Sequence, residues 1–140
     1  MTDKQAFKLE HTHVLLAEDN IVNRMVATSI LKKFGCSVTP AGNGKEALDM
    51  AVERRFSLVF MDCQMPEMDG YEATRAIRKF EEQSGAERAL IVAFTASVMA
   101  EDRELCLNAG MDDFMTKPVL PDDIEKLLRK WLPGNVAKGV

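Results

Sequence analysis

The strongest constraint on the fold is a run of four apolar residues, Leu58 to Met61, that leads directly into Asp62. Pro66 follows shortly afterwards and prevents the run from continuing as a strand or a helix. A strand that is apolar on both faces is typical of the centre of a parallel sheet, with helices covering each side. Asp62 is then expected at the carboxyl end of the strand, where open α/β sheets bind their ligands. Because Asp also commonly begins turns, this stretch alone leaves both interpretations open.

Four more short apolar segments occur along the chain, and each is followed by residues with helical spacing. The predicted strands cover 13–17, 37–41, 58–62, 90–94 and 113–116. The predicted helices follow them and begin near 20, 45, 71, 101 and 121. This alternation predicts a doubly wound, five-stranded parallel sheet of the flavodoxin-like (βα)5 type, with the strand order 2-1-3-4-5.

Two local features of this pattern can be compared directly with a structure. In the first helix, apolar residues recur at helical spacing and are expected to face the core: Val22, Met25, Val26 and Ile30. In the turn after the Asp62 strand, Gly70 is expected to adopt a positive φ angle.

Composition restricts the classes of function. A net charge of −4 and a pI near 5.2 argue against a nucleic-acid partner, since phosphate backbones require a basic surface. The three cysteines have no CxxC spacing and indicate reduced thiols in the cytoplasm. The polar N-terminus does not resemble a signal peptide, and no apolar run is long enough to cross a bilayer, so we expect no membrane contact. We expect one domain over 13–132, with tails or linkers at 1–12 and 133–140.

Polar side chains lie at the ends of four of the predicted strands: Glu18 and Asp19 follow the first, Asp62 ends the third, Thr95 follows the fourth, and Lys117 follows the fifth. The acids after the first strand could simply cap the next helix. If the strand ends meet at one edge of the sheet, however, three carboxylates lie together and need a cation in order to remain ionised. An all-oxygen set of ligands suits Mg²⁺. A divalent ion, a lysine and a hydroxyl together predict a site for a phosphoryl group.

Asp62 is the available nucleophile at this predicted site, and carboxylates do accept phosphoryl groups as acyl phosphates. One alternative is a phosphatase with an aspartate nucleophile, acting on small substrates. Such enzymes typically place a second Asp two residues after the nucleophile, where this chain has Gln64. Another alternative is an interaction module that has lost the ability to take phosphate, which the complete set of acids, lysine and threonine argues against.

The same residues carry a family resemblance. They are Glu18-Asp19, Met61-Asp62-x-x-Met65-Pro66-x-Met68-Asp69-Gly70, Thr95-Ala96 and Lys117-Pro118. Over about residues 13–132 the chain resembles a response-regulator receiver domain of two-component signalling. The local sequence around Glu18 and Asp62 is most similar to that of receivers of hybrid sensor histidine kinases. A stand-alone single-domain response regulator is the alternative context.

The resemblance implies a role for each site residue. Asp62 would accept phosphate from a phosphohistidine on a histidine kinase or a histidine phosphotransfer protein. Asp19, Asp62 and the backbone carbonyl of Gln64 would bind Mg²⁺ (or Mn²⁺) directly, and Glu18 would act through water. Lys117 would pair with the phosphoryl group, and its peptide bond to the following proline would be cis. The domain itself would carry out self-phosphorylation and autodephosphorylation.

The resemblance also implies a conformational switch. Thr95 would move toward the phosphate and allow the aromatic ring of Phe114 to turn inward, which changes the partner surface formed by the fourth helix, the fifth strand and the last helix. The domain would be a monomer, or a weak dimer through that surface. Phe114 replaces the tyrosine of many relatives, so the outward hydroxyl is missing. Gln64 and Ser97 occupy positions that tune the lifetime of the acyl phosphate.

Overall fold

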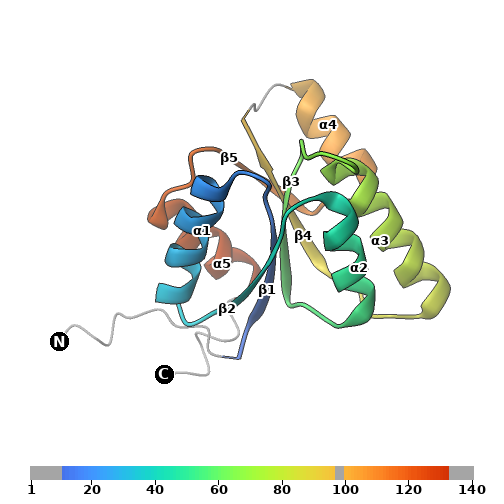
Figure 1. Cartoon of the computed structure of the whole chain (residues 1–140), viewed down its shortest axis with the longest axis horizontal. Coiled ribbons are helices and arrows are strands. Elements are labelled where there is room, and N and C mark those ends of the chain that lie inside the picture. Colours follow the sequence, from blue (N-terminus) through green and yellow to red (C-terminus); the bar gives the residue numbers. More distant parts are fainter. Residues whose placement is uncertain (1–10, 97–99, 133–140) are drawn as a thin grey trace.

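The computed structural model describes residues 11–96 and 100–132 as one sheet covered by helices on both faces (Figure 1). All strand pairs are parallel, and the order is β2-β1-β3-β4-β5, which confirms the predicted fold class. The strands are β1 (His13–Ala17), β2 (Ser37–Ala41), β3 (Leu58–Asp62), β4 (Leu90–Thr95) and β5 (Asp113–Thr116). The helices are α1 (Ile21–Lys33), α2 (Gly44–Glu53), α3 (Gly70–Ser84), α4 (Ala100–Ala109) and α5 (Pro121–Trp131).

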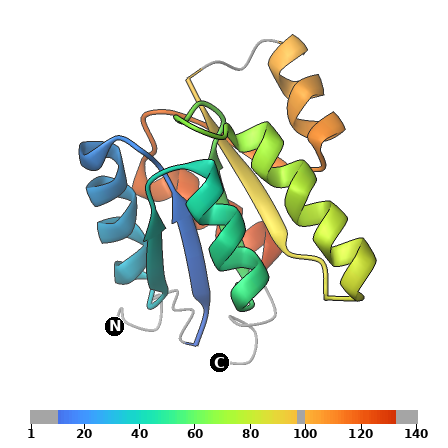
Figure 2. The same cartoon turned by 45° about the vertical axis from the view of Figure 1, so that its right-hand side comes forward.

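The helices form two layers around the sheet. Figures 1 and 2 show α1 and α5 on one face, and α2, α3 and α4 on the other. Side chains alternate along β3, so that Phe60 packs in the α1–α5 layer while Val59 and Met61 pack in the layer of α2, α3 and α4. All five residues of β3 are buried, as a central parallel strand requires. No helix of the described residues is long and apolar enough to cross a membrane.

The face of α1 that contacts the sheet differs from the predicted one. The buried residues of this helix are Ala27, Ile30 and Leu31. Of the predicted core residues only Ile30 is buried, and the other three are exposed: Val22, Met25 and Val26. The helix carries apolar residues on two faces, so periodicity alone cannot choose between them. Ala27 is fully buried in the core on this side of the sheet.

Gly70 has a different role from the predicted one. Its φ angle is not positive; the left-handed position in this turn is Glu67, at φ 68°. A Cβ atom at Gly70 would instead overlap the backbone carbonyl of Asp62. The Gly70 amide donates a hydrogen bond to the Cys63 carbonyl at 3.1 Å, so glycine allows the start of α3 to lie directly against the end of β3. This contact fixes the loop beside Asp62.

Helix caps fix the other loops at this end of the sheet. The Asn20 side chain accepts a hydrogen bond from the Asn23 amide and starts α1 immediately after β1. Asp69 and Glu72 form a reciprocal capping box at the start of α3. These caps hold short connections, so the residues at the strand ends have little freedom to move apart.

Candidate functional site

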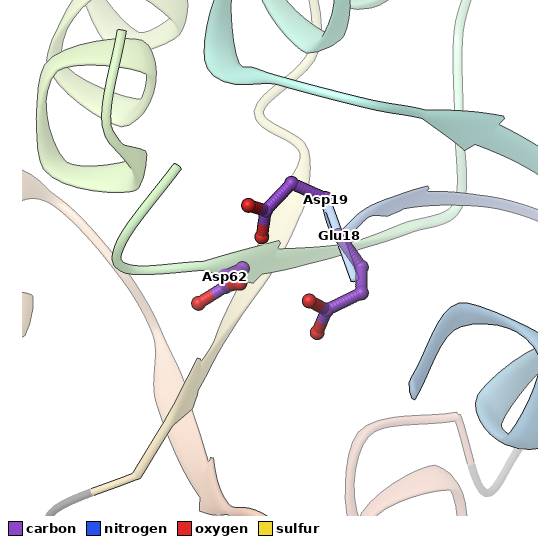
Figure 3. Close-up of side chains that lie close together, drawn as sticks. All are labelled: Glu18, Asp19 and Asp62. Atoms are coloured by element: carbon purple, nitrogen blue, oxygen red, sulfur yellow. The ribbon is translucent and has the colours of Figure 1, made fainter. Parts of the chain in front are cut away.

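The predicted acids meet at the carboxyl ends of the two central strands. Glu18 and Asp19 directly follow β1, and Asp62 is the last residue of β3, the neighbouring strand. Figure 3 shows the three carboxylates close together, and one ligand oxygen from each lies within 4.8 Å of the others. Glu18 and Asp62 are 1% and 4% exposed, whereas Asp19 is exposed to solvent.

Lys117 connects the two buried acids. Its Nζ atom lies 3.0 Å from Asp62 Oδ2 and 3.0 Å from Glu18 Oε1. The Lys117 amide donates a hydrogen bond to the Thr95 carbonyl at 2.8 Å, which places the residue at the end of the neighbouring strand. The Lys117–Pro118 peptide bond is cis, as the resemblance implies. The ammonium group therefore lies on the floor of the site, between the two carboxylates.

The remaining contacts leave acceptor capacity in the acid cluster. Asp62 Oδ1 accepts a hydrogen bond from the Gln64 amide at 3.1 Å, and Glu18 Oε2 accepts one from the Asn20 amide at 3.1 Å. Glu18 Oε1 is fully buried and receives no hydrogen bond of good geometry, although the Lys117 ammonium is close to it. Buried polar atoms are normally hydrogen-bonded, so this oxygen is available to an additional cation or a water molecule.

The charges of the site are strongly coupled. Burial raises the pKa of the Asp62 carboxyl above its ordinary value; the Lys117 ammonium and the Gln64 amide oppose this increase, and Glu18 adds to it. Burial lowers the pKa of Lys117, but its two carboxylate partners outweigh that effect, and the net shift is upward. The ammonium therefore stays charged, while the second buried carboxylate makes ionisation of Asp62 costly. A divalent cation among the acids would remove that cost.

The acid cluster lines an open cleft of about 650 Å³, which also contains Thr95 and Lys117. The structure thus brings together all five predicted polar side chains. Gln64, from the loop after β3, lines the same cleft. Phe114 lies on β5, partly buried, with the Arg103 guanidinium 5.0 Å from the centre of its ring. Ser97 lies outside the described residues.

Asp113, the first residue of β5, connects this strand to α5. Its Oδ2 atom accepts hydrogen bonds from the Trp131 indole at 2.8 Å and from Lys130 at 3.2 Å. Burial alone would raise the pKa of Asp113, but these two donors and the Phe114 amide outweigh it and lower the pKa. Phe114 therefore follows a residue, Asp113, that is bound to α5, and its own ring contacts Arg103 of α4.

The sequence did not predict two further residues of the cleft, Tyr71 from α3 and Asp102 from α4. Tyr71 hydrogen-bonds to Cys63, which is buried beside Cys106, and burial raises the pKa of Cys63 to about 12. Such thiols are unreactive, so Cys63 acts as a small apolar residue behind Asp62. The position of Tyr71 directly after the Asp69-Gly70 turn could have suggested its place at the cleft.

The fold and the site together define the class of protein. The chain belongs to the response regulator receiver domain family, whose model matches residues 14–129. It is 42% identical over 118 residues to hybrid signal transduction histidine kinase A of Dictyostelium discoideum, in a match that covers 84% of this chain and 6% of that protein. The chain thus spans a small fraction of the length of such curated relatives.

Solved structures agree with this assignment. One similar structure is the receiver domain of sensor histidine kinase PA1611 from Pseudomonas aeruginosa PAO1, which has a magnesium ion coordinated in the active site cleft. It matches with a TM-score of 0.78 and 38% sequence identity, and the match covers 87% of this chain and 98% of that chain. Another is the co-crystal structure of the Saccharomyces cerevisiae histidine phosphotransfer signaling protein Ypd1 and the receiver domain of its downstream response regulator Ssk1. It matches with a TM-score of 0.84 and 36% sequence identity, and the match covers 89% of this chain and 91% of that chain.

Proposed function

We propose that this domain is the phosphoacceptor of a two-component phosphorelay, in which Asp62 takes a phosphoryl group from a phosphohistidine. The observation that carries the proposal is a carboxylate at the end of β3, 4% exposed, with a lysine ammonium at 3.0 Å and two further acids around it. In the transfer, a bond forms between phosphorus and an Asp62 oxygen while the bond between phosphorus and the imidazole nitrogen breaks. The imidazole keeps the electron pair and takes a proton from water.

Lys117 and Thr95 are proposed to stabilise the transferred group. The Lys117 ammonium now lies between Glu18 and Asp62, and a short movement lets it pair with a phosphoryl oxygen instead. The Thr95 hydroxyl lies at the end of the adjacent strand and lines the same cleft, where it can donate a hydrogen bond to another phosphoryl oxygen. Hydrolysis of the acyl phosphate by water would return the site to its starting state.

The acid cluster fits Mg²⁺, or Mn²⁺, as its cofactor. Asp19, Asp62 and the backbone carbonyl of Gln64 would bind the ion directly, and Glu18 would hold it through water. The buried Glu18 Oε1, which accepts no hydrogen bond of good geometry, and the all-oxygen donor set support this assignment. When bound, the ion supplies charge that offsets the negative equatorial oxygens of the phosphoryl group.

Phosphorylation is proposed to change the surface formed by α4, β5 and α5. A phosphoryl group adds a charge of about −1.5 to −2 beside Thr95, which then moves toward it. The space that Thr95 vacates allows Phe114 to turn inward, away from the Arg103 guanidinium. The domain would be a monomer, or a weak dimer through this surface.

We further propose that the chain is the receiver of a cytoplasmic hybrid sensor histidine kinase, with the domain over 13–132 and linkers over 1–12 and 133–140. The much greater length of the kinases that it resembles supports this context over a stand-alone response regulator. Its phosphate donor would be a histidine kinase or a histidine phosphotransfer protein.

Incubation with acetyl phosphate and Mg²⁺ tests the acceptor function without a protein partner. We expect a gain of one phosphoryl group per chain by intact mass, and no gain in Asp62→Asn or in the presence of EDTA. Release of many phosphates per chain from small phosphoesters would instead indicate the phosphatase alternative. Labelling of Asp62→Asn to the wild-type extent would contradict the proposal.

A further inference from the structure

Helix α4 contacts the rest of the domain through small apolar side chains. Among its described residues, Cys106 and Ala109 are buried, whereas Leu105 and Leu107 are 50% and 63% exposed. Figures 1 and 2 show the helix at the margin of its layer, beside α3. A helix that buries so little apolar surface is held weakly, so each polar contact that it makes has a large share in fixing its position.

Arg103 is the residue of α4 that contacts the aromatic ring of Phe114. It precedes Cys106 by three residues and therefore lies on the same side of the helix. Its guanidinium carbon is 5.0 Å from the centre of the Phe114 ring, a distance at which a cation is attracted to the face of an aromatic ring. No carboxylate forms an ion pair with Arg103 within residues 11–96 and 100–132. In this part of the chain the ring is the partner of its charge.

The backbone on both sides of Phe114 is fixed. Asp113 is bound to α5 by the hydrogen bonds described above, and Met115 is 7% exposed in the opposite helical layer. Beside Phe114 on the neighbouring strand lies Ala93, whose small side chain is fully buried on the same face of the sheet. The phenylalanine ring has no hydroxyl group with which to form a hydrogen bond at the surface. A change at this position must therefore come from rotation of the ring.

We infer that Arg103 is a positioning residue, which holds Phe114 in its outward orientation and thereby opposes phosphorylation of Asp62. The inference rests on the proposed phosphoacceptor function, in which Phe114 turns inward when Thr95 moves toward the phosphoryl group. The Arg103 side chain is exposed, so a ring that turns inward leaves its guanidinium. The contact is then made in only one of the two states, and it shifts the equilibrium toward that state.

Thermodynamic linkage fixes the sign of the effect on the site. A phosphoryl group favours the inward ring, so a contact that stabilises the outward ring weakens phosphoryl binding by the same factor. At an exposed site, attraction between a cation and an aromatic face changes an equilibrium constant by about two- to fivefold. Arg103 is not among the residues that line the cleft, so its effect on Asp62 passes through Phe114. Removal of the guanidinium is expected to make Asp62 a better acceptor.

The same contact joins the ring to the readout surface. When Phe114 turns inward, α4 loses its contact with β5 through Arg103, while Cys106 and Ala109 remain buried. Because the helix is held weakly, loss of this contact allows it to shift. Arg103 therefore relates the orientation of one ring to the position of a whole helix.

Arg103→Gln tests the inference with beryllium fluoride, an analogue of the phosphoryl group that binds without a transfer step. Beryllium is titrated into the chain in Mg²⁺ and excess fluoride, and binding is followed by calorimetry. We expect the affinity to rise by about two- to fivefold in Arg103→Gln. Arg103→Lys retains a cation and should stay closer to the wild-type affinity. Labelling rates with acetyl phosphate should follow the same order.

Fluorine NMR reports the orientation of the ring itself. The seven phenylalanines are replaced with 4-fluorophenylalanine, and the Phe114 signal is identified by its absence in Phe114→Leu. Beryllium fluoride should move this signal in the wild-type chain. In ligand-free Arg103→Gln, the signal should lie part of the way toward the bound position, and an unchanged signal would contradict the inference.

Two controls separate the contact from a general effect of charge. Arg75→Gln removes the same charge from an exposed residue of α3 and should leave the affinity for beryllium fluoride unchanged. In a Phe114→Leu background, Arg103→Gln should have no effect, because the ring is missing. Equal affinities in Arg103→Gln and the wild-type chain would overturn the inference, as would an equal gain in Arg75→Gln or in the Phe114→Leu background. Failure of acetyl phosphate to label the wild-type chain would count against the proposed function instead.

Discussion

Replacement of Lys117 with methionine tests the electrostatic balance of the site. The substitution removes the ammonium and keeps most of the aliphatic stem. Lys117 lies 3.0 Å from each of two carboxylates that are almost fully buried, Glu18 and Asp62. Without the ammonium, these carboxylates face one another with no cation between them, so we expect the free energy of unfolding to fall.

The magnitude follows from the two distances. With an effective dielectric constant of about 20, one contact between unit charges at 3.0 Å is worth about 5.5 kcal/mol. The cost of removing lysine from water offsets part of this attraction, and its side chain is still 21% exposed, which allows solvent screening. Loss of one partner from a buried pair typically costs about 3–5 kcal/mol. We therefore expect Lys117→Met to lose about 2–4 kcal/mol.

Urea unfolding, followed by circular dichroism at neutral pH in EDTA, measures this loss. In an Asp62→Asn background the same substitution should cost about half as much, because one of the two carboxylate partners is already neutral. Added Mg²⁺ should also reduce the loss, since the ion supplies positive charge to the same acids. A loss below about 0.5 kcal/mol in EDTA, or an equal loss in both backgrounds, would refute the electrostatic reasoning.

Three further predictions concern other contacts. Gly70→Ala should lose about 1–3 kcal/mol in urea unfolding because its Cβ overlaps the Asp62 carbonyl, while Gly42→Ala, where the nearest atom is 3.5 Å away, should change little. Asp113→Asn should be less stable than wild type at pH 7 by about 1 kcal/mol. Because the pKa of Asp113 is lowered in the fold, this difference in stability should disappear as the pH falls through that pKa. A constant difference down to about pH 2 would contradict this reasoning. Mg²⁺ should raise the thermal midpoint of the wild-type chain and should raise that of Asp62→Asn much less, so equal shifts would place the ion elsewhere.

The sequence was sufficient for the fold because its signals agree with one another. The apolar runs that become β1, β3 and β4 are almost entirely buried, as the lack of alternation in the sequence predicted. Parallel strands deliver their carboxyl ends to one edge, so the grouping of Glu18, Asp62 and Lys117 followed from topology. Their mutual distances depend on side-chain packing and on the loop after β5, which a linear pattern does not encode.

The α1 helix shows where sequence patterns are insufficient. Val22, Met25 and Val26 have the same helical spacing as residues of a core stripe, yet they are exposed because Ala27 and Leu31 contact the sheet. A helix that is apolar on two faces satisfies the periodicity twice.

Burial of the two adjacent acids could not be predicted either. Glu18 is buried and Asp19 is exposed, although both directly follow β1. The Glu18 side chain turns inward because Lys117 and the Asn20 amide accompany it there. These partners come from different parts of the chain, so only the three-dimensional arrangement distinguishes the two residues.

The most direct test of the central claim is to locate the phosphoryl group after transfer from a phosphorylated histidine phosphotransfer protein in the presence of Mg²⁺. The account predicts a single phosphoryl group, mapped by peptide mass spectrometry to Asp62, with loss of the same group from the donor histidine. Asp62→Asn should remain unlabelled under the same conditions. A phosphoryl group found on another residue, or full labelling of the Asp62→Asn variant, would contradict the account.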